Sequence, residues 1–118
     1  MFDVTIIGAG PAGTAAGYDL LQAGYKVLLM DRADFPRQKA CAGGLTPRTL
    51  VWFRYDVSGV VKRECRRVRV VPQGSRPFVI ESDKTLCWMV ERNELDTFLL
   101  KKAVEKGGRF QKIRRIRS

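Results

Sequence analysis

Residues 2–17, FDVTIIGAGPAGTAAG, decide how the first part of this chain folds. The apolar, β-branched run at residues 2–7 predicts a buried strand, which the glycine cluster ends. The alanine- and leucine-rich segment from Pro11 to Ala23 predicts a helix, and residues 25–30, YKVLLM, predict a second buried strand. Two strands joined by one helix in so short a segment predict a βαβ unit over residues 1–34, with its strands parallel.

The glycine-rich segment after the first strand has the spacing of a dinucleotide-binding turn. It follows a predicted strand and opens a predicted helix, which is the context that gives a GxGxxG spacing its meaning. Gly8 would make the tight turn, Gly10 would let the backbone approach a pyrophosphate, and Gly13 would let helix and strand pack closely. Pro11 and Ala12 begin the helix, whose free N–H groups and positive dipole end favour phosphates.

Asp31 ends the second predicted strand, at the position where an acidic residue meets the adenosine ribose of a bound dinucleotide. Its carboxylate would accept hydrogen bonds from the ribose hydroxyls and would disfavour a 2′-phosphate. NADP is therefore a poor fit at this site. The spacing does not separate NAD from FAD, because both contain ADP.

The remaining sequence predicts an α/β chain with a Rossmann-like fold, in which antiparallel strands are inserted into a small parallel sheet. Residues 31–47 read as a loop, and the residues between about 65 and 91 read as the inserted strands. The alternating residues 67–70 predict a strand with one solvent-exposed face. A helix is expected from Thr46 to about Tyr55, with its aromatic residues Trp52, Phe53 and Tyr55 packed in a core. Cys65 and Cys87 are expected to be small core residues. A second helix, capped by Asn93, is expected to run to about Lys106, and a last strand is expected over residues 109–116.

Composition narrows the class of function. The chain has 118 residues, with 22 basic and 12 acidic side chains. Its net charge of +10 predicts either an anionic partner or an acidic partner that is missing from this chain. Histidine is absent, and the three cysteines have no CxxC spacing, so neither a metal site nor a disulfide framework is expected. This cysteine usage fits a reducing cytoplasm. The N-terminus does not read as a signal peptide, and no run approaches the length of a membrane-spanning helix.

Two basic segments have a second interpretation. Residues 62–70 and the tail at residues 112–118 are rich in arginine and lysine, a pattern that also occurs in proteins that bind RNA, phosphates or anionic lipid. We interpret both as solvated strand faces and expect no nucleic-acid partner. A non-catalytic basic binding module on a Rossmann-like base remains the alternative from a different functional class.

Three segments resemble known flavoproteins. Residues 3–32 resemble the N-terminal FAD-binding segment of the glutathione-reductase and p-hydroxybenzoate-hydroxylase type. Residues 31–50, DRADFPRQKACAGGLTPRTL, resemble the geranylgeranyl reductase family, whose members carry a similar FPR-K-C-GG-L pattern. Residues 90–110, VERNELDTFLLKKAVEKGGRF, resemble the next marker of that family, an arginine and an aspartate that head a helix. The resemblance implies an FAD/NAD(P)-binding fold with FAD as cofactor.

The resemblance also implies an activity and roles for individual residues. The family reduces double bonds of geranylgeranyl groups with FAD and an outside electron donor, for which NAD(P)H is a candidate; related flavoproteins include monooxygenases and halogenases, which remain alternatives. The implied substrate is an isoprenoid lipid or diphosphate. The implied sites are Gly8, Gly10, Gly13, Asp31 and Arg32 at the ADP half, Arg92 near the phosphates or ribose, and Lys39, Cys41, Ala42, Gly43 and Gly44 toward the flavin ring. Cys41 is the one catalytic candidate, with a role in shaping the cavity favoured over acid catalysis or redox exchange.

The length of the chain departs from the family pattern. Family members have several hundred residues, with a late glycine–aspartate segment for the ribityl side of the flavin and a domain that holds the substrate. We therefore expect residues 1–118 to be the N-terminal part of an FAD-binding domain, without the substrate domain and inactive alone. An exposed sheet edge would then favour self-association. A cytoplasmic protein in peripheral contact with membranes would suit an isoprenoid substrate.

Overall fold

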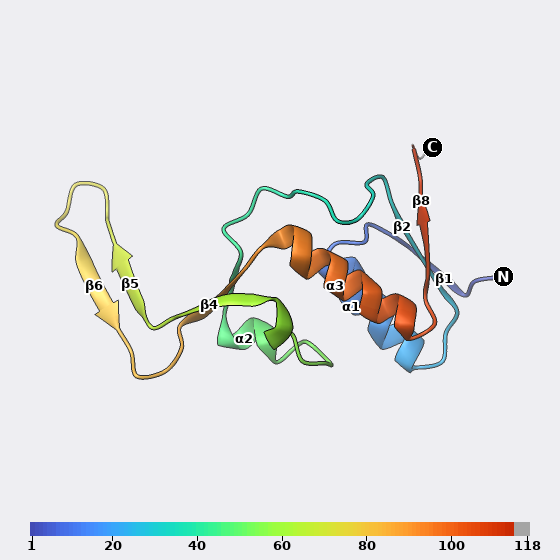
Figure 1. The fold of residues 1–118 in the computed structure, drawn as a ribbon, viewed down its shortest axis with the longest axis horizontal. Helices are drawn as coiled ribbons and strands as arrows, with labels where there is room; N and C mark the ends of the chain where they lie inside the picture. Colours follow the sequence, from blue (N-terminus) through green and yellow to red (C-terminus); the bar gives the residue numbers. More distant parts are fainter. Residues whose placement is uncertain (115–118) are drawn as a thin grey trace. The chain divides into compact units, whose positions relative to one another are not determined.

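The structure is a computed structural model that describes residues 1–114 and divides into two compact units (Figure 1). The first unit combines Met1–Ala40 with the described part of Arg92–Ser118, and the second unit is Cys41–Glu91. The chain leaves the first unit after the second strand and returns to it at a long helix. Each unit has a sheet of its own.

A three-stranded parallel sheet forms the centre of the first unit. Its strands are β1 (Val4–Ile7), β2 (Val27–Asp31) and β8 (Arg109–Lys112), in the order β1-β2-β8. Val4 pairs with Val27, which confirms the parallel pair that the sequence predicts. The middle strand is the most apolar and the most buried, as expected for a strand with neighbours on both sides.

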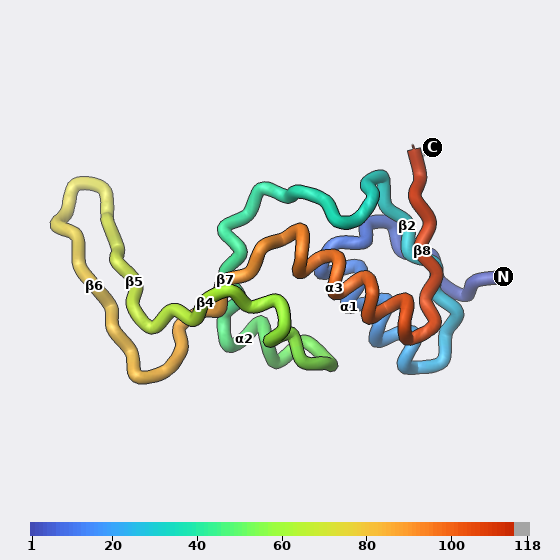
Figure 2. The backbone as a smooth tube through the Cα atoms, in the orientation of Figure 1, coloured from blue at the N-terminus to red at the C-terminus, as the bar shows by residue number. Residues whose placement is uncertain are grey.

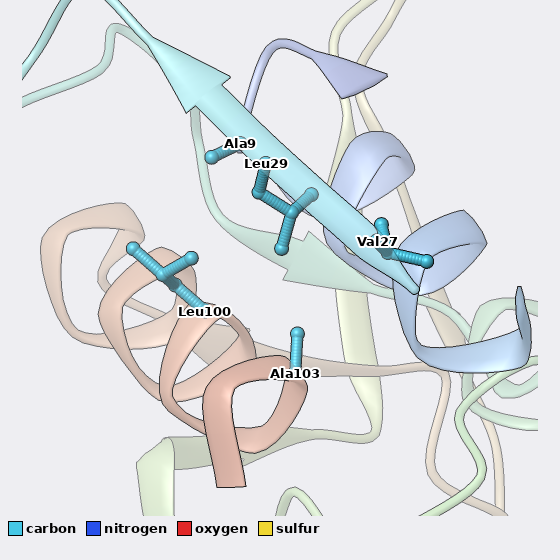
Figure 3. Close-up of a cluster of buried hydrophobic side chains, with 5 residues drawn as sticks. All are labelled: Ala9, Val27, Leu29, Leu100 and Ala103. Atoms are coloured by element: carbon cyan, nitrogen blue, oxygen red, sulfur yellow. The ribbon is translucent and has the colours of Figure 1, made fainter. Parts of the chain in front are cut away.

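Two helices, α1 (Pro11–Gln22) and α3 (Arg92–Glu105), pack together and cover this sheet. Leu100 and Ala103 of α3 meet Val27 and Leu29 of β2 in a buried cluster that also contains Ala9 (Figure 3). The apolar residues that surround this cluster are Ile6, Leu20, Leu21, Phe35 and Phe110. The core thus joins residues from both ends of the chain, so the βαβ unit depends on α3 and β8 for its burial.

The second unit is mostly β structure. Its elements are β3 (Gly44–Leu45), α2 (Pro47–Leu50), a 3-10 turn (Ser58–Val60), β4 (Val61–Cys65), β5 (Arg67–Val70), β6 (Phe78–Glu81) and β7 (Cys87–Val90). The strands β3, β7 and β4 form one antiparallel sheet, whereas β5 and β6 form a separate two-stranded ribbon (Figure 2). The antiparallel strands therefore begin at Gly44 rather than near residue 65.

The short helix is the clearest difference from the sequence-based expectation. Thr46 caps it as predicted, because its side chain accepts a hydrogen bond from the Thr49 N–H at 3.3 Å. The helix ends at Leu50, however, and does not reach Tyr55. Trp52 lies beyond its end and is 66% exposed, so the expectation that Trp52 packs in a core is wrong.

Three smaller expectations also differ from the structure. The ribbon strand Arg67–Val70 is exposed on both faces through most of its length, because no layer of the described chain covers it. Cys65 and Cys87 are half-buried rather than core residues. Asn93 lies inside the first turn of α3, where its Oδ1 accepts the N–H of Glu94, so it does not precede the helix as a cap.

Two observations bear on the remaining expectations. The last strand is present as β8, and the part of its predicted range at residues 115–116 lies outside the described residues. Among the residues that the structure describes, no helix has both the length and the apolar character needed to cross a bilayer.

Gly13 tests the packing of α1 on the end of β1. A Cβ at this position would lie 1.8 Å from the carbonyl oxygen of Gly8, far inside van der Waals contact. Because the obstructing atom belongs to the backbone, the turn or the helix must move. We expect Gly13→Ala to lower the free energy of unfolding by about 2 kcal/mol or more, measured by urea denaturation.

Gly59→Ala is the matched control for this substitution. No heavy atom lies within 4 Å of the Cβ position at Gly59, and its backbone is not in the left-handed region. We expect the control to change the free energy of unfolding by less than about 0.5 kcal/mol. Equal stability of the two variants would show that the close approach at Gly13 does not constrain the fold.

Candidate functional site

A cavity of about 850 Å³ lies in the first unit, where β1 and β2 end and α1 begins. The carboxyl ends of parallel strands are the usual place for a ligand in an α/β sheet. The lining residues come from the glycine-rich turn, the segment after β2, the start of α3 and the segment after β8. They are Ile7, Gly8, Gly10, Pro11, Ala12, Gly13, Asp31, Arg32, Ala33, Arg37, Gln38, Lys39, Arg92, Ile113 and Arg114.

The N-terminus of α1 opens toward this cavity without a side-chain cap. Gly10 precedes the helix in an extended conformation, Pro11 occupies its first turn, and the first turn holds no acidic residue. The Thr14 hydroxyl is buried and is bonded to the Gly10 carbonyl oxygen at 2.9 Å, so it does not cap the helix either. The free N–H groups and the helix dipole therefore favour an anion at this end.

Asp31 occupies the centre of a hydrogen-bond network at the end of β2. Its Oδ2 accepts the Ala9 N–H at 2.8 Å, and its Oδ1 accepts the Ala33 N–H at 3.0 Å. Burial opposes ionisation, but the bonds from these two N–H groups, the positive charge of Arg37 and a bond from the backbone of Arg32 outweigh it. The pKa of Asp31 therefore lies below its usual value of 3.8, and the side chain is a carboxylate at neutral pH.

A buried carboxylate holds two arginines at the cavity. The Asp96 side chain is fully buried, and it accepts a two-point contact from Arg92, with Nε–Oδ1 at 2.8 Å and Nη2–Oδ2 at 3.0 Å. Arg37 makes an ion pair with the same carboxylate, with Nη1–Oδ2 at 3.1 Å. Because Asp96 carries one negative charge and the arginines carry two positive charges, the cluster keeps a net positive charge beside the cavity. We call these three residues the arginine clamp.

Arg37 is the clamp residue nearest the glycine-rich turn. A Cβ at Gly10 would lie 3.3 Å from its Nη2, so the guanidinium lies directly against the turn. The guanidinium also lies over the Phe35 ring, with its Cζ 5.0 Å from the ring centroid, a cation–π contact. Its Nη1 is buried and has no hydrogen-bond acceptor among the described residues, although it is ion-paired with Asp96. Arg37 therefore lies between the buried carboxylate of Asp96 and the glycine-rich turn.

The charge of the cavity fits a diphosphate. Five basic side chains and one acidic side chain are among the lining residues. Arginine forks and backbone N–H groups recognise phosphate oxygens directly, whereas Asp31 lies where a ribose would follow. The cavity therefore suits the ADP part of a dinucleotide.

The structure brings together most of the site residues that the sequence predicts. The cavity is lined by Gly8, Gly10, Pro11, Ala12, Gly13, Asp31, Arg32, Lys39 and Arg92. Sequence analysis did not identify Arg37 as a site residue, although it lies within the FPR pattern. Asp96 was not identified as a site residue either, although the arginine and aspartate that head this helix are the marker behind the family resemblance. Its position four residues after Arg92 is where the two side chains can meet.

The predicted flavin-facing residues Cys41, Ala42, Gly43 and Gly44 belong to the second unit and do not line this cavity. Gly43 has a packing requirement of its own. Its φ is +76°, and a Cβ there would lie 2.0 Å from the carbonyl oxygen of Val90. The neighbouring Gly44 has no such requirement, because a Cβ would contact only the Met89 sulfur at 3.9 Å. Among the described residues, no cluster of three or more metal-ligating side chains occurs.

Comparison with known proteins extends this assignment. The FAD binding domain family matches residues 1–118. An uncharacterized protein of Methanosarcina barkeri is 43% identical over 92% of the chain, and digeranylgeranylglycerophospholipid reductase 1 of Methanopyrus kandleri is 34% identical over 98% of it. The chain spans only 28% and 31% of these two proteins. The predicted resemblance to geranylgeranyl reductases is thus confirmed.

Solved structures agree on the fold. A geranylgeranyl bacteriochlorophyll reductase-like protein of Thermoplasma acidophilum superposes with a TM-score of 0.77 over 94% of this chain and 30% of its own, at 23% identity. The flavin-dependent brominase Bmp2 superposes with a TM-score of 0.71 over 93% of this chain and 29% of its own, at 28% identity.

FAD fits the residues that are present. The uncapped helix end, the arginine clamp and Asp31 supply donors for a diphosphate and an acceptor for a ribose. A match that extends along the whole chain, together with a cavity suited to ADP, places this chain in the FAD binding domain family.

Proposed function

We propose that the cavity of the first unit holds the ADP half of FAD. We also propose that a longer protein containing this chain reduces double bonds of isoprenoid groups. The observation that carries the first part is the arginine clamp beside an uncapped helix end. The name of the Methanopyrus kandleri relative supports the second part.

The residues of the chain would divide the binding work. Ala12 and Gly13, in the first turn of α1, would donate their backbone N–H groups to the pyrophosphate, with Arg37 and Arg92 beside them. Asp31 would accept hydrogen bonds from the ribose. Both of its oxygens already accept one backbone N–H, and each carboxylate oxygen has a second lone pair for this purpose.

The segment after the cavity would lead toward the flavin ring. Lys39 lines the cavity, and Cys41 to Gly44 follow it in the sequence. Gly44 has free space at its Cβ position, which would allow a flat ring to approach the backbone. Cys41 would shape the substrate cavity rather than exchange electrons. FAD itself would supply the hydride chemistry, with NAD(P)H as the proposed outside donor, and the protein would bind and orient it.

The substrate proposal has a competitor within the flavoproteins. The brominase Bmp2 shares the fold, so a halogenase or monooxygenase activity of the longer protein is the alternative. Identity along nearly the whole chain to a protein named as a digeranylgeranylglycerophospholipid reductase favours the isoprenoid reductase. Such a substrate would bring the longer protein, in the cytoplasm, to the surface of a membrane.

Competition with ADP tests the binding proposal directly. The recombinant chain is titrated with FAD while flavin fluorescence is followed, and ADP is then added. We expect ADP to displace FAD, and an ADP analogue with a 2′-phosphate to displace it less well, because Asp31 repels the extra charge. Bound FAD that ADP cannot displace would contradict the site. For the activity, the longest form that the gene encodes is assayed with geranylgeranyl diphosphate and reduced FAD. A parallel assay supplies bromide, oxygen and an electron-rich aromatic compound instead, and a brominated product there would favour the alternative.

Asp31→Asn tests both roles of this side chain. The amide would present an NH₂ group to one of the two backbone N–H donors, so we expect the free energy of unfolding to fall by about 2 kcal/mol. We expect FAD affinity to fall about tenfold or more, since one ribose acceptor is lost. Asp34→Asn is the control, because Asp34 is exposed and pairs with Lys112 at the surface.

The lowered pKa of Asp31 sets the pH dependence of this contribution. A carboxylate that the fold favours stabilises fully above its unfolded pKa, near 3.8, and the stabilisation is lost as the pH falls through the lower folded pKa. We expect the stability difference between the wild type and Asp31→Asn to be constant between pH 5 and 7 and to shrink only under strong acid. A difference that disappears already near pH 6 would contradict the ionisation assigned to Asp31.

Asp96→Asn tests whether the arginine clamp serves the ligand. Removing the buried charge leaves two arginines without their counterion, so we expect a loss of about 3 kcal/mol in unfolding free energy and a large loss of FAD affinity.

Arg37→Lys keeps the positive charge but loses the planar fork. We expect this variant to stay folded and to bind FAD about tenfold more weakly.

Glu105→Gln is the matched control on the same helix. Glu105 pairs with Lys101 and Lys102 at the exposed end of α3, where ion pairs contribute little. We expect its stability and FAD affinity to match the wild type. If Arg37→Lys also binds FAD like the wild type, the clamp is a structural ion pair and does not contact the cofactor.

A further inference from the structure

Two cysteines of the second unit face each other across a pair of antiparallel strands. Cys65 is the last residue of β4 and Cys87 is the first residue of β7, and the register pairs them directly. The next pair along the ladder is Glu64 and Trp88, whose side chains meet in a hydrogen bond of 3.0 Å from Nε1 to Oε1. Side chains on alternate positions point to opposite faces, so the two cysteines meet on the other face.

The two cysteines lie directly opposite each other in the ladder. Burial raises the pKa of the Cys87 thiol, and a hydrogen bond with the Cys65 thiol raises it further. The Cys87 Sγ also lies 3.8 Å from the Sδ of Met89, two residues along the same face. Both cysteines are free thiols, and both are half-buried, so small molecules in solution can reach them. The register therefore pairs two oxidisable thiols in a folded sheet.

The backbone spacing of such a pair matches a disulfide. Directly opposed residues of antiparallel strands have Cα atoms about 4.5–5.5 Å apart, whereas disulfides span Cα distances of about 4.4–6.8 Å. We propose that Cys65 and Cys87 form a thiol–disulfide modification site, oxidised by small disulfides such as glutathione disulfide and restored by thiols.

The chemistry balances without help from the flavin. One cysteine thiolate attacks glutathione disulfide, forms a mixed disulfide and releases one glutathione thiolate. The second cysteine thiolate attacks the protein sulfur of that mixed disulfide and releases the second glutathione thiolate. The pair loses two electrons and two protons, and one glutathione disulfide becomes two glutathione thiols. The cysteine pair therefore needs no other oxidant.

The crosslink would enclose a defined part of the second unit. Residues 66–86, which include both strands of the β5–β6 ribbon, would form the closed loop. The crosslinked strand β7 also pairs with β3, in which Gly44 lies opposite Met89. Oxidation would therefore fix the base of the ribbon and stiffen the sheet that carries the segment proposed to approach the flavin. The cysteine pair itself does not depend on that proposal.

Tryptic mapping tests the pair in the wild-type chain. Trypsin cleaves between the two cysteines at several arginines and at Lys84, so Cys65 falls in the peptide of residues 64–66 and Cys87 in the peptide of residues 85–92. After incubation with glutathione disulfide, we expect these two peptides to appear as one linked species that dithiothreitol separates. The peptide of residues 40–48, which contains Cys41, should instead carry glutathione or remain free.

Cysteine variants supply the controls. Cys41→Ser retains only the pair, so its intact mass should fall by two hydrogen atoms on oxidation. Cys65→Ser and Cys87→Ser each leave the other cysteine without its partner, so one glutathionyl group should replace the hydrogen of that thiol and no crosslink between the two peptides should form. In oxidised Cys41→Ser, amide hydrogens of β7 should exchange about tenfold more slowly than in the reduced form. A linkage of either cysteine to Cys41, or stable glutathione adducts on Cys65 and Cys87 without a crosslink, would overturn the proposal.

Discussion

The first unit depends on a single carboxylate at the end of its middle strand. Asp31 accepts the N–H of Ala9 from the glycine-rich turn and the N–H of Ala33 from the segment after β2, while its own carbonyl oxygen accepts the N–H of Ile113 after β8. One residue therefore joins the ends of all three parallel strands. Because these ends form the wall of the cavity, the interaction that holds the sheet together also shapes the place where a dinucleotide would lie.

A second constraint on the fold is the buried negative charge of Asp96, which the two arginines of the clamp compensate. A fully buried carboxylate would be costly alone, and Asp96 is compensated by a two-point contact with Arg92 and an ion pair with Arg37. Such a cluster is weak evidence for stability, because apolar side chains of similar size often serve the core as well. Its position between α3 and the glycine-rich turn gives a more specific reason for it. Two guanidinium groups that are fixed before a ligand arrives lose little conformational freedom when phosphate binds.

The sequence predicted the parts of the structure that local patterns determine. Strands β1 and β2, helix α1 and the glycine-rich turn follow from apolar runs and from the residues at the helix start. The expectation that the first strand is buried is wrong, however, because β1 is an edge strand with no fully buried residue, and Ile7 is 63% exposed. The second unit could not be predicted to the same extent, because its register depends on pairing between residues far apart, such as Cys65 with Cys87. The ribbon β5–β6 was expected to have one covered face, but coverage depends on neighbouring chain rather than on alternation in the strand.

The site shows the same division between local and distant determinants. Glycine spacing and Asp31 were predictable because the dinucleotide turn constrains residues near one another in sequence. The role of Arg37 was not predictable from the sequence. Its position against Gly10 involves an ion pair with Asp96, which lies far away in the sequence on α3. Gly43 was predicted to let the flavin ring approach the backbone. In the structure, the nearby carbonyl oxygen of Val90 already requires a residue without a Cβ at this position. A glycine in a motif therefore identifies a close approach without identifying what approaches.

The excess positive charge of the chain has two different physical settings. In the ribbon region, Arg67 and Arg66 are solvated and form exposed ion pairs with Glu81 and Glu64, at 3.0 and 3.7 Å, which contribute little. At the cavity, Arg37 is largely buried and held by Asp96, so water cannot screen its charge in the same way. An anion at the cavity therefore gains more from each positive charge than an anion at the ribbon. A net charge of +10 alone predicts an anionic partner, but the burial of the clamp is what favours a diphosphate at one defined place.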